Sequence, residues 1–291
     1  MFRGSIPALV TIFRDEAFAE DVFRAFVDWQ IAEGSHALVP CGTTGESATL
    51  SPDEHYRVVQ VCVEAAAGRV PVLAGCGSND TASAIRNMRA AKERGADAAL
   101  IVLPYYNRPS QDGLVAHFKA LTEACDLPIV VYNVPSRTVT DILPDTLARV
   151  AGLPGVIGIK DAHGDLNRVA DQRRLCGPDF VQLSGNDGTA LGFNAMGGTG
   201  CISVTANVAP RLCADFQNAC LEGRWRDALA LQDRLHPLHC ALFSDASPGP
   251  VKYALARLRP DFASEIRLPM TMPGEASRKA VDAALAHAGL T

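Results

Sequence analysis

The stretch Ile129-Val130-Val131-Tyr132-Asn133-Val134 is a short apolar run, rich in branched residues, in which polar groups appear only near the end. A nearly continuous apolar run of this length is typical of a parallel β-strand that is buried on both faces. Seven more runs of this kind follow the same pattern, at Ile6–Phe13, His36–Cys41, Val70–Gly75, Ala98–Leu103, Val156–Lys160, Phe180–Ser184 and Gly200–Val204. The chain therefore contains eight candidate strands.

Helical patterns separate these runs. Ser51-Pro52-Asp53-Glu54 combines a cap residue, a first-turn proline and acidic residues, as at the start of a helix. Apolar residues at helical spacing predict further helices at Ala17–Glu33, Asn79–Arg94, Gln111–Ala124 and Val208–Leu221. Eight strands, each followed by a helix, predict an α/β fold, a (β/α)8 TIM barrel over residues 1–223.

A doubly wound open sheet is the alternative, because it shares the alternation of strands and helices. The count of eight favours the barrel, as does the lack of a Gly-x-Gly-x-x-Gly motif after the first run. Residues 224–291 contain no clear strand. Their helical patterns, at Arg224–Phe243, Pro248–Leu258 and Glu275–Ala288, predict a C-terminal helical region packed on the barrel.

The composition excludes several classes of protein. The chain has 291 residues, of which 48% are hydrophobic and 20% charged, as in ordinary globular proteins. The net charge of −5, without a basic run, argues against nucleic-acid and membrane partners, and no apolar stretch approaches the ~20 residues of a membrane span. Nine scattered cysteines predict reduced thiols in a cytoplasmic protein. His236, His239 and Cys240 match no zinc spacing, so no metal site is expected.

Lys160 is the first candidate catalytic residue. Active sites of barrels lie at the C-terminal ends of the strands, and Lys160 is the one lysine of five that ends a predicted strand. Burial disfavours the charged form of an amine, and a neutral amine attacks ketones to form a Schiff base. The alternative is a lysine that reaches solvent. Position alone leaves both open, and the hydroxyl groups expected nearby favour catalysis.

Other polar groups follow neighbouring strands. Tyr132 could shuttle protons, although a core tyrosine with a hydrogen-bonded hydroxyl is the simpler interpretation. The turn Gly42-Thr43-Thr44-Gly45-Glu46 offers backbone N–H groups and hydroxyls to an anion, or is a plain loop before a helix. Arg137 suits a substrate carboxylate, or a surface salt bridge. For Asp161 and Asp187, roles at helix ends are expected rather than acid catalysis.

These motifs together resemble the dihydrodipicolinate synthase family, the 4-hydroxy-tetrahydrodipicolinate synthases of the N-acetylneuraminate lyase superfamily. The resemblance runs essentially end to end and rests on three motifs, Gly42–Ser47, Tyr132–Thr138 and Gly158–Lys160. It extends to Pro104–Ser110, Ile202–Asn207 and Arg267–Met270.

The resemblance implies a class I lyase of diaminopimelate and lysine biosynthesis. Pyruvate would form an imine on Lys160, and its enamine would add to L-aspartate 4-semialdehyde to give 4-hydroxy-tetrahydrodipicolinate. The resemblance further implies no cofactor and a homotetramer, a dimer of dimers. A sister pyruvate aldolase acting on a sugar acid or hydroxy-oxoacid is the alternative, and Arg137 argues against it. A non-enzymatic barrel is a third hypothesis, disfavoured by the intact set of catalytic residues.

The same resemblance implies roles for individual residues. Tyr132, Thr43 and Tyr106 match a proton relay, with Tyr106 reaching the site of a neighbouring subunit. Thr44, with the Thr43 loop, would hold the carboxylate of pyruvate, and Arg137 that of the semialdehyde. Backbone groups of two further positions would line the pyruvate pocket, namely Gly185 and Ile202.

An allosteric lysine site is also implied by the resemblance. Five residues match it: Ser47, Ala48, His55, Asn79 and Tyr105. Ser83, however, stands where lysine-sensitive members carry a glutamate, and Pro52 where they carry a histidine. An ammonium group would lose its charged partner, so weak or absent inhibition by lysine is predicted.

Overall fold

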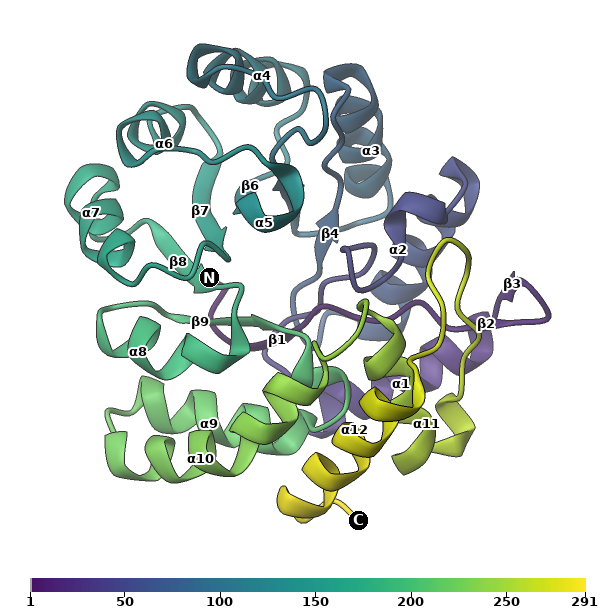
Figure 1. The fold of residues 1–291 in the computed structure, drawn as a ribbon. Coiled ribbons are helices and arrows are strands. Elements are labelled where there is room, and N and C mark those ends of the chain that lie inside the picture. Colours follow the sequence, from purple (N-terminus) through teal and green to yellow (C-terminus); the bar gives the residue numbers. More distant parts are fainter. Residues whose placement is uncertain (1) are drawn as a thin grey trace.

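The computed structural model describes residues 2–291, and its helices surround a ring of parallel strands (Figure 1). Seven strands pair in the order β1-β9-β8-β7-β6-β5-β4, and every pair is parallel. Their bounds are Gly4–Pro7 (β1), Leu73–Gly75 (β4), Ala98–Val102 (β5), Ile129–Asn133 (β6), Val156–Asp161 (β7), Val181–Ser184 (β8) and Gly200–Ser203 (β9).

Residues 36–41 close the ring between β1 and β4. They form isolated parallel bridges, Ala8 with Val39 and Leu38 with Val72, instead of a regular strand. The N–H of Leu9 donates to the oxygen of Val39 at 2.9 Å, and that of Leu73 to the oxygen of Leu38 at 2.9 Å. Both edges of the seven-stranded sheet are thus joined, which confirms the TIM barrel and excludes the open sheet.

The first predicted run is too long. Strand β1 ends at Pro7, and Phe13–Arg14 (β2) pairs antiparallel with Ala17–Phe18 (β3) in a hairpin. Asp15 and Glu16 have positive φ angles of 50° and 61°, the conformation of a tight hairpin turn. The chain therefore reverses where one continuous run was expected, and the first helix starts at Glu20 instead of Ala17.

The helices between the strands cover the outside of the barrel (Figure 1). Ser51 caps α2 as predicted, because its hydroxyl accepts the N–H of Glu54 and the Glu54 carboxylate accepts the N–H of Ser51. The short helix α5 (Pro135–Thr138) follows β6 directly. The longer ones are α1 (Glu20–Ala32), α2 (Pro52–Ala66), α3 (Thr81–Glu93), α4 (Gln111–Ala124), α6 (Pro144–Ala151), α7 (Asn167–Cys176), α8 (Ala190–Ala195) and α9 (Pro210–Leu221).

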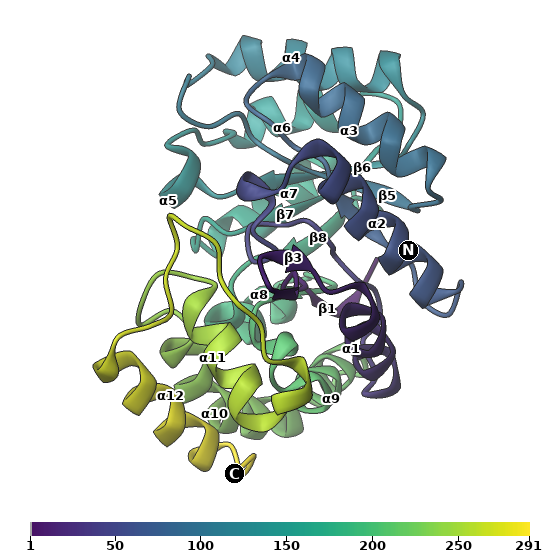
Figure 2. The same cartoon turned by 90° about the vertical axis from the view of Figure 1, so that its right-hand side faces the viewer.

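Three further helices form the C-terminal region, α10 (Trp225–Ala241), α11 (Gly249–Leu258) and α12 (Glu275–His287). Figure 2 shows them together on one side of the barrel. This confirms the C-terminal helical extension. Because α10 packs against α9 as well as α12, the division between residues 223 and 224 stays a prediction.

The core has two layers that follow the alternation of side chains along each strand. On β6, Val130 and Tyr132 belong to the cluster inside the barrel, whereas Val131 faces the helices. On β7, Ile159 faces the helices, so its neighbour Lys160 points into the barrel. The alternation alone therefore brings Tyr132 and Lys160 to the same interior space.

None of the helices in residues 2–291 is long and apolar enough to cross a membrane. Within the same residues, no group of three or more His, Cys, Asp or Glu side chains is arranged to hold a metal ion. His239, one of the three residues whose spacing matches no zinc site, forms a hydrogen bond through Nδ1 with the hydroxyl of Thr205 at 2.8 Å.

Candidate active site

A cavity of about 360 Å³ lies at the C-terminal ends of the strands. Strand ends, βα loops and the segment before α11 all contribute to its wall. Its lining residues are Thr43, Thr44, Tyr132, Val134, Ser136, Arg137, Lys160, Ala162, Gly185, Asn186, Val204, Phe243 and Ser247. Six of the predicted site residues are therefore brought together in one place.

Lys160 and Tyr132 form one wall of the cavity. They are paired in register on β7 and β6 and are 6% and 7% exposed. The Nζ atom of Lys160 lies 4.0 Å from the centroid of the Tyr132 ring, within the range of a cation–π contact. The amine is thus held in one place, largely out of solvent, with a phenol beside it.

Gly185 keeps room for this lysine. A Cβ atom at position 185 would lie 3.1 Å from Cε of Lys160 and 2.7 Å from Cβ of Ala162. The N–H of Gly185 donates to the oxygen of Asp161 at 2.8 Å, so the backbone cannot easily retreat. A larger residue here would displace the Lys160 side chain.

The loop after residues 36–41 forms the opposite wall. Its turn is closed by two hydrogen bonds, from the N–H of Gly45 to the oxygen of Gly42 and from the N–H of Glu46 to the oxygen of Thr43, both at 3.1 Å. A Cβ atom on Gly45 would lie 2.9 Å from the oxygen of Leu9, which explains the glycine. The turn places Thr43 and Thr44 on the cavity wall.

Arg137 stands at the rim of the cavity. It lies on α5 and is exposed. In the part of the chain that the structure describes, no carboxylate forms an ion pair with its guanidinium group, although most other arginines have such a partner. Within residues 2–291, the surface salt bridge that was the alternative is not formed, and Arg137 lines the cavity without a carboxylate partner.

Comparison with known proteins assigns the chain to a family. The model of the dihydrodipicolinate synthetase family matches residues 1–288. The chain belongs to this family. It is 73% identical to a 4-hydroxy-tetrahydrodipicolinate synthase of Rhizorhabdus wittichii and 66% identical to one of Sphingopyxis alaskensis, over 290 residues and 100% of both chains in each case.

A solved structure of the family agrees with the whole fold. It is the chloride-inhibited dihydrodipicolinate synthase of Acinetobacter baumannii complexed with pyruvate, which is 40% identical to this chain. The two superpose with a TM-score of 0.97 over 100% of both chains.

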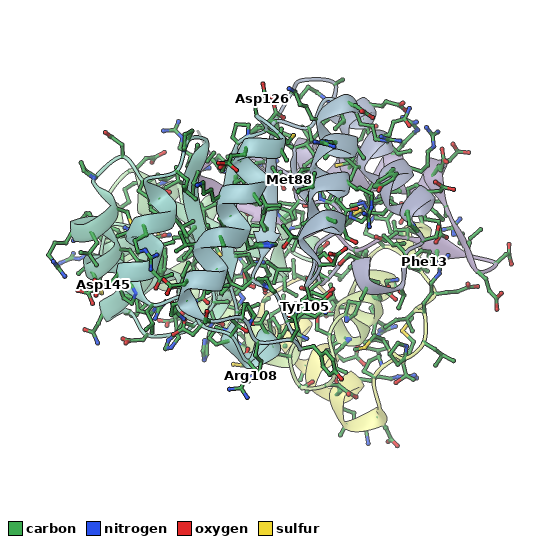
Figure 3. The ribbon with its side chains drawn as sticks, turned by 90° about the horizontal axis from the view of Figure 1, so that it is seen from above. Phe13, Met88, Tyr105, Arg108, Asp126 and Asp145 are labelled. Carbon is green, nitrogen blue, oxygen red and sulfur yellow. The ribbon has the colours of Figure 1, made fainter. Side chains whose placement is uncertain are left out.

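Two residues assigned by the family resemblance do not line this cavity. Tyr106 is 90% exposed and has a φ angle of 72° on the loop after β5. The loop extends outward at this point, since the side chain of Arg108, two residues further on, projects away from the molecule (Figure 3). Ile202 is buried inside the barrel, paired with Ile6 in register. The roles predicted for Tyr106 and for the backbone of Ile202 stay predictions.

The residues that match the family's lysine site lie on the barrel's outer loops and helices. His55 is buried, and its Nε2 lies 2.8 Å from the oxygen of Gly75, while burial lowers its pKa. The backbone oxygen of Asn79 accepts a hydrogen bond from the side-chain amide of Asn107 at 2.8 Å. The other three, Ser47, Ala48 and Tyr105, are half-buried or exposed.

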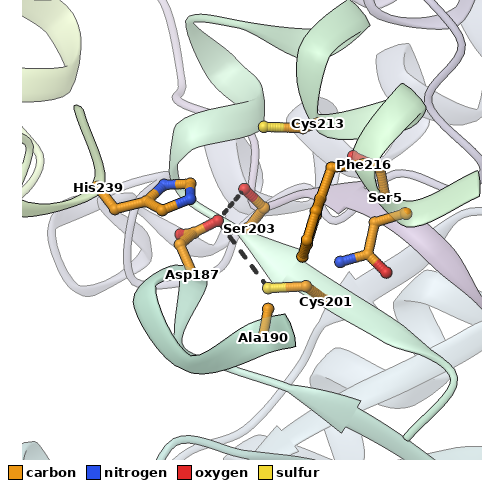
Figure 4. A pocket seen from close by; sticks show the side chains of 9 residues that line it. Ser5, Asp187, Ala190, Cys201, Ser203, Cys213, Phe216 and His239 are labelled. Atoms are coloured by element: carbon orange, nitrogen blue, oxygen red, sulfur yellow. Dashed lines mark hydrogen bonds between the residues drawn. The ribbon is translucent and has the colours of Figure 1, made fainter. Parts of the chain in front are cut away.

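Asp187 has the expected role at a helix end, because it lies in the first turn of a short 3-10 helix, Asp187–Thr189. Asp161 does not, because it ends β7 and the next helix begins only at Asn167. Asp161 is buried and accepts hydrogen bonds from Arg168 Nε at 3.0 Å and Gln172 Nε2 at 2.6 Å. Asp187 lines a separate cavity of about 10 Å³ (Figure 4) and accepts the N–H of Val204 at 2.9 Å. Both carboxylates anchor strand ends, since buried carboxylates require such donors.

Sequence reasoning missed Phe243 and Ser247, which line the cavity from the C-terminal region. They follow no strand, so the rule about strand ends could not find them. It also passed over a second buried lysine, Lys252, which is 1% exposed and whose pKa burial lowers to about 8. Lys252 lies three residues before Leu255, on the buried face of α11. This helical spacing was the one sign in the sequence that the lysine is buried.

Proposed function

We propose that this chain condenses pyruvate with L-aspartate 4-semialdehyde to form 4-hydroxy-tetrahydrodipicolinate, a step of diaminopimelate and lysine biosynthesis. The observation that carries the proposal is the buried amine of Lys160, held against Tyr132 in a cavity of about 360 Å³. The names of the relatives and the pyruvate complex of the A. baumannii protein support the same activity.

The reaction begins with attack of the Lys160 amine on the ketone carbon of pyruvate. Loss of water gives an imine, and loss of a methyl proton gives an enamine. The enamine carbon bonds to the aldehyde carbon of the semialdehyde, whose oxygen takes up a proton. The amine of the semialdehyde then attacks the imine carbon, closes the ring and releases Lys160. No cofactor takes part.

The remaining residues bind substrates and move protons. Tyr132 and Thr43 transfer protons to and from the reacting oxygen and carbon atoms, completed by Tyr106 of a neighbouring subunit in a homotetramer. The Thr43–Thr44 turn holds the carboxylate of pyruvate, aided by the backbone of Gly185 and Ile202. Arg137 binds the carboxylate of the semialdehyde.

The cytoplasmic location, which the scattered cysteines predict, remains a prediction.

Borohydride reduction in the presence of pyruvate, followed by peptide mass spectrometry, tests the proposal. The expected result is a single adduct on Lys160, absent from Lys160→Met and retained in Lys279→Met. An adduct on Lys252 instead would refute the mechanism. A coupled assay with the semialdehyde then distinguishes this activity from that of a sister aldolase, which would turn over sugar acids or hydroxy-oxoacids instead.

A further inference from the structure

Lys252 connects three distant parts of the chain. Its ammonium group forms an ion pair with Glu46, and neither side chain is more than 1% exposed. It also donates to the backbone oxygen of Glu265 at 2.6 Å and lies 4.6 Å from the centroid of the Phe13 ring. A buried ammonium group persists only where partners compensate for its lost hydration. These contacts therefore fix the position of the Lys252 head group.

Glu46 connects the Lys252 head group to the turn that lines the cavity. Its second carboxylate oxygen accepts the N–H of Arg267 at 2.9 Å, and its own N–H donates to the oxygen of Thr43 at 3.1 Å. Its φ angle of 55° is left-handed, a conformation that a residue with a Cβ keeps only when its surroundings impose it. The side chain is thus held by the C-terminal region and the backbone by the turn.

We propose that Lys252 is a positioning residue that, through its ion pair with Glu46, holds Thr43 and Thr44 in the geometry that binds pyruvate. This inference rests on the proposed function of the cavity. Lys252 is not among the residues that line the cavity, so it acts only through Glu46. Ser247, five residues before it, does line the cavity, so one short segment supports both the C-terminal wall and the turn.

An exposed ion pair of the same region provides the matched control. Lys279 and Glu275 pair one turn apart on α12, with side chains 76% and 81% exposed. Exposed pairs of this kind contribute little because water and salt screen them. Lys279→Met is therefore expected to leave the KM for pyruvate and the melting temperature unchanged.

Lys252→Met is expected to lower kcat/KM for pyruvate ~10- to 100-fold, mainly through KM, because a small displacement of binding groups has effects of this size. Borohydride should still trap pyruvate on Lys160 at saturating concentration. Wild-type-like kinetics in a folded Lys252→Met variant would overturn the inference. Failure to trap pyruvate on Lys160 of the wild-type protein would instead overturn the proposed function.

The double variant Glu46→Gln with Lys252→Met separates positioning from stability. It leaves no unpaired charge, so its melting temperature should rise above that of Lys252→Met. The KM for pyruvate should remain raised, since the link to the turn is lost. If the KM for pyruvate recovers together with the melting temperature, the ion pair between Lys252 and Glu46 only stabilises the fold, and the inference is wrong. If the single variant does not fold, this variant and Glu46→Asp, which shortens the link, give the same test.

Discussion

The two facing walls of the cavity are held in different ways. The strand wall, Tyr132 and Lys160, belongs to neighbouring strands of a continuous parallel ladder. The loop wall, Thr43 and Thr44, follows a segment that makes only isolated bridges, and Glu46 anchors it to Arg267, 221 positions away in the chain. One wall is fixed by local pairing and the other by distant side chains.

This difference assigns different tasks to the walls. A ladder fixes backbone positions closely, which suits the amine and the phenol that must meet the reacting atoms. A turn held by a few buried charges depends on each of those contacts. Changes to the strand wall should therefore alter kcat, and changes behind the loop wall should alter substrate binding.

Removal of the nucleophile should have the largest effect. Lys160→Met should lower kcat by ~10³-fold or more, because Lys160 is the one lysine among the residues that line the cavity and is the proposed site of the imine. The melting temperature should remain near that of the wild type. Lys119→Met, an exposed lysine on α4, is the control and should retain full activity. A Lys160→Met enzyme with a tenth of normal activity would contradict the assignment.

The support behind the strand wall should have the next largest effect, on stability. Arg168 pairs with Asp161, with side chains 9% and 4% exposed, and also with Asp141. Arg168→Met leaves a buried carboxylate unpaired, so the free energy of unfolding should fall by about 3–5 kcal/mol. Urea unfolding measures this loss. Arg174→Met, on the exposed face of α7, should cost less than ~1 kcal/mol. Similar losses for both variants would contradict the comparison.

Arg137 tests the rim between the two walls. Arg137→Ala should raise the KM for the semialdehyde ~10- to 100-fold, the size expected for loss of a charge-assisted hydrogen bond. The KM for pyruvate should not change, because we propose that the separate turn of Thr43 and Thr44 binds pyruvate. Steady-state kinetics with each substrate varied in turn provides the measurement, with Arg149→Ala on α6 as control. An equal effect on both KM values would show that Arg137 does not discriminate between them.

The ion pair between Glu54 and Arg267 should weaken in acid. It lies behind the loop wall, because the N–H of Arg267 donates to Glu46. Two hydrogen bonds from Arg267 lower the pKa of Glu54 from 4.5 to about 2. A carboxyl group with a lowered folded-state pKa stabilises the protein above pH 4.5, and this contribution is lost as the pH falls toward 2. Because the pair is partly exposed, the contribution should be only ~1 kcal/mol.

Glu54→Gln isolates this contribution, since glutamine keeps the capping box with Ser51. The variant should be less stable than the wild type at pH 7 and should converge with it on acidification. Urea unfolding at a series of pH values gives the difference. A gap between the two proteins that does not narrow in acid would rule out the ion pair with Arg267 as its cause.

The smallest effect is expected for added lysine. The loop wall continues into Ser47 and Ala48, which match the family's lysine site, but Ser83 offers no carboxylate. Its hydroxyl accepts a hydrogen bond from Arg86 at 2.6 Å and donates one to the carboxylate of Asp80 at 2.5 Å, so charged side chains of this chain already occupy this position. Lysine should therefore inhibit weakly or not at all, as measured by initial rates. A submillimolar inhibition constant would show that the loop wall is regulated after all.

Particular residues show how far sequence reasoning reached. The sequence points to Lys160 and Tyr132 because both lie at or near the end of an apolar run. That both side chains point into the barrel follows only from the alternation along β6 and β7 in the structure. Residues 36–41 formed the expected side of the barrel, but only through isolated bridges. The hairpin at Asp15 and Glu16 was missed, because its positive φ angles belong to residues other than glycine or asparagine.

By itself, the sequence determined the alternation of strands and helices, the place of Lys160 at a strand end and the turn that carries Thr43 and Thr44. These features depend on spacing within a few residues, which a linear reading contains. Only the tertiary structure decided that Phe243 and Ser247 line the cavity and that Lys252 meets Glu46. Such contacts depend on how the C-terminal helices pack against the barrel, and no local pattern encodes a pairing between residues so far apart.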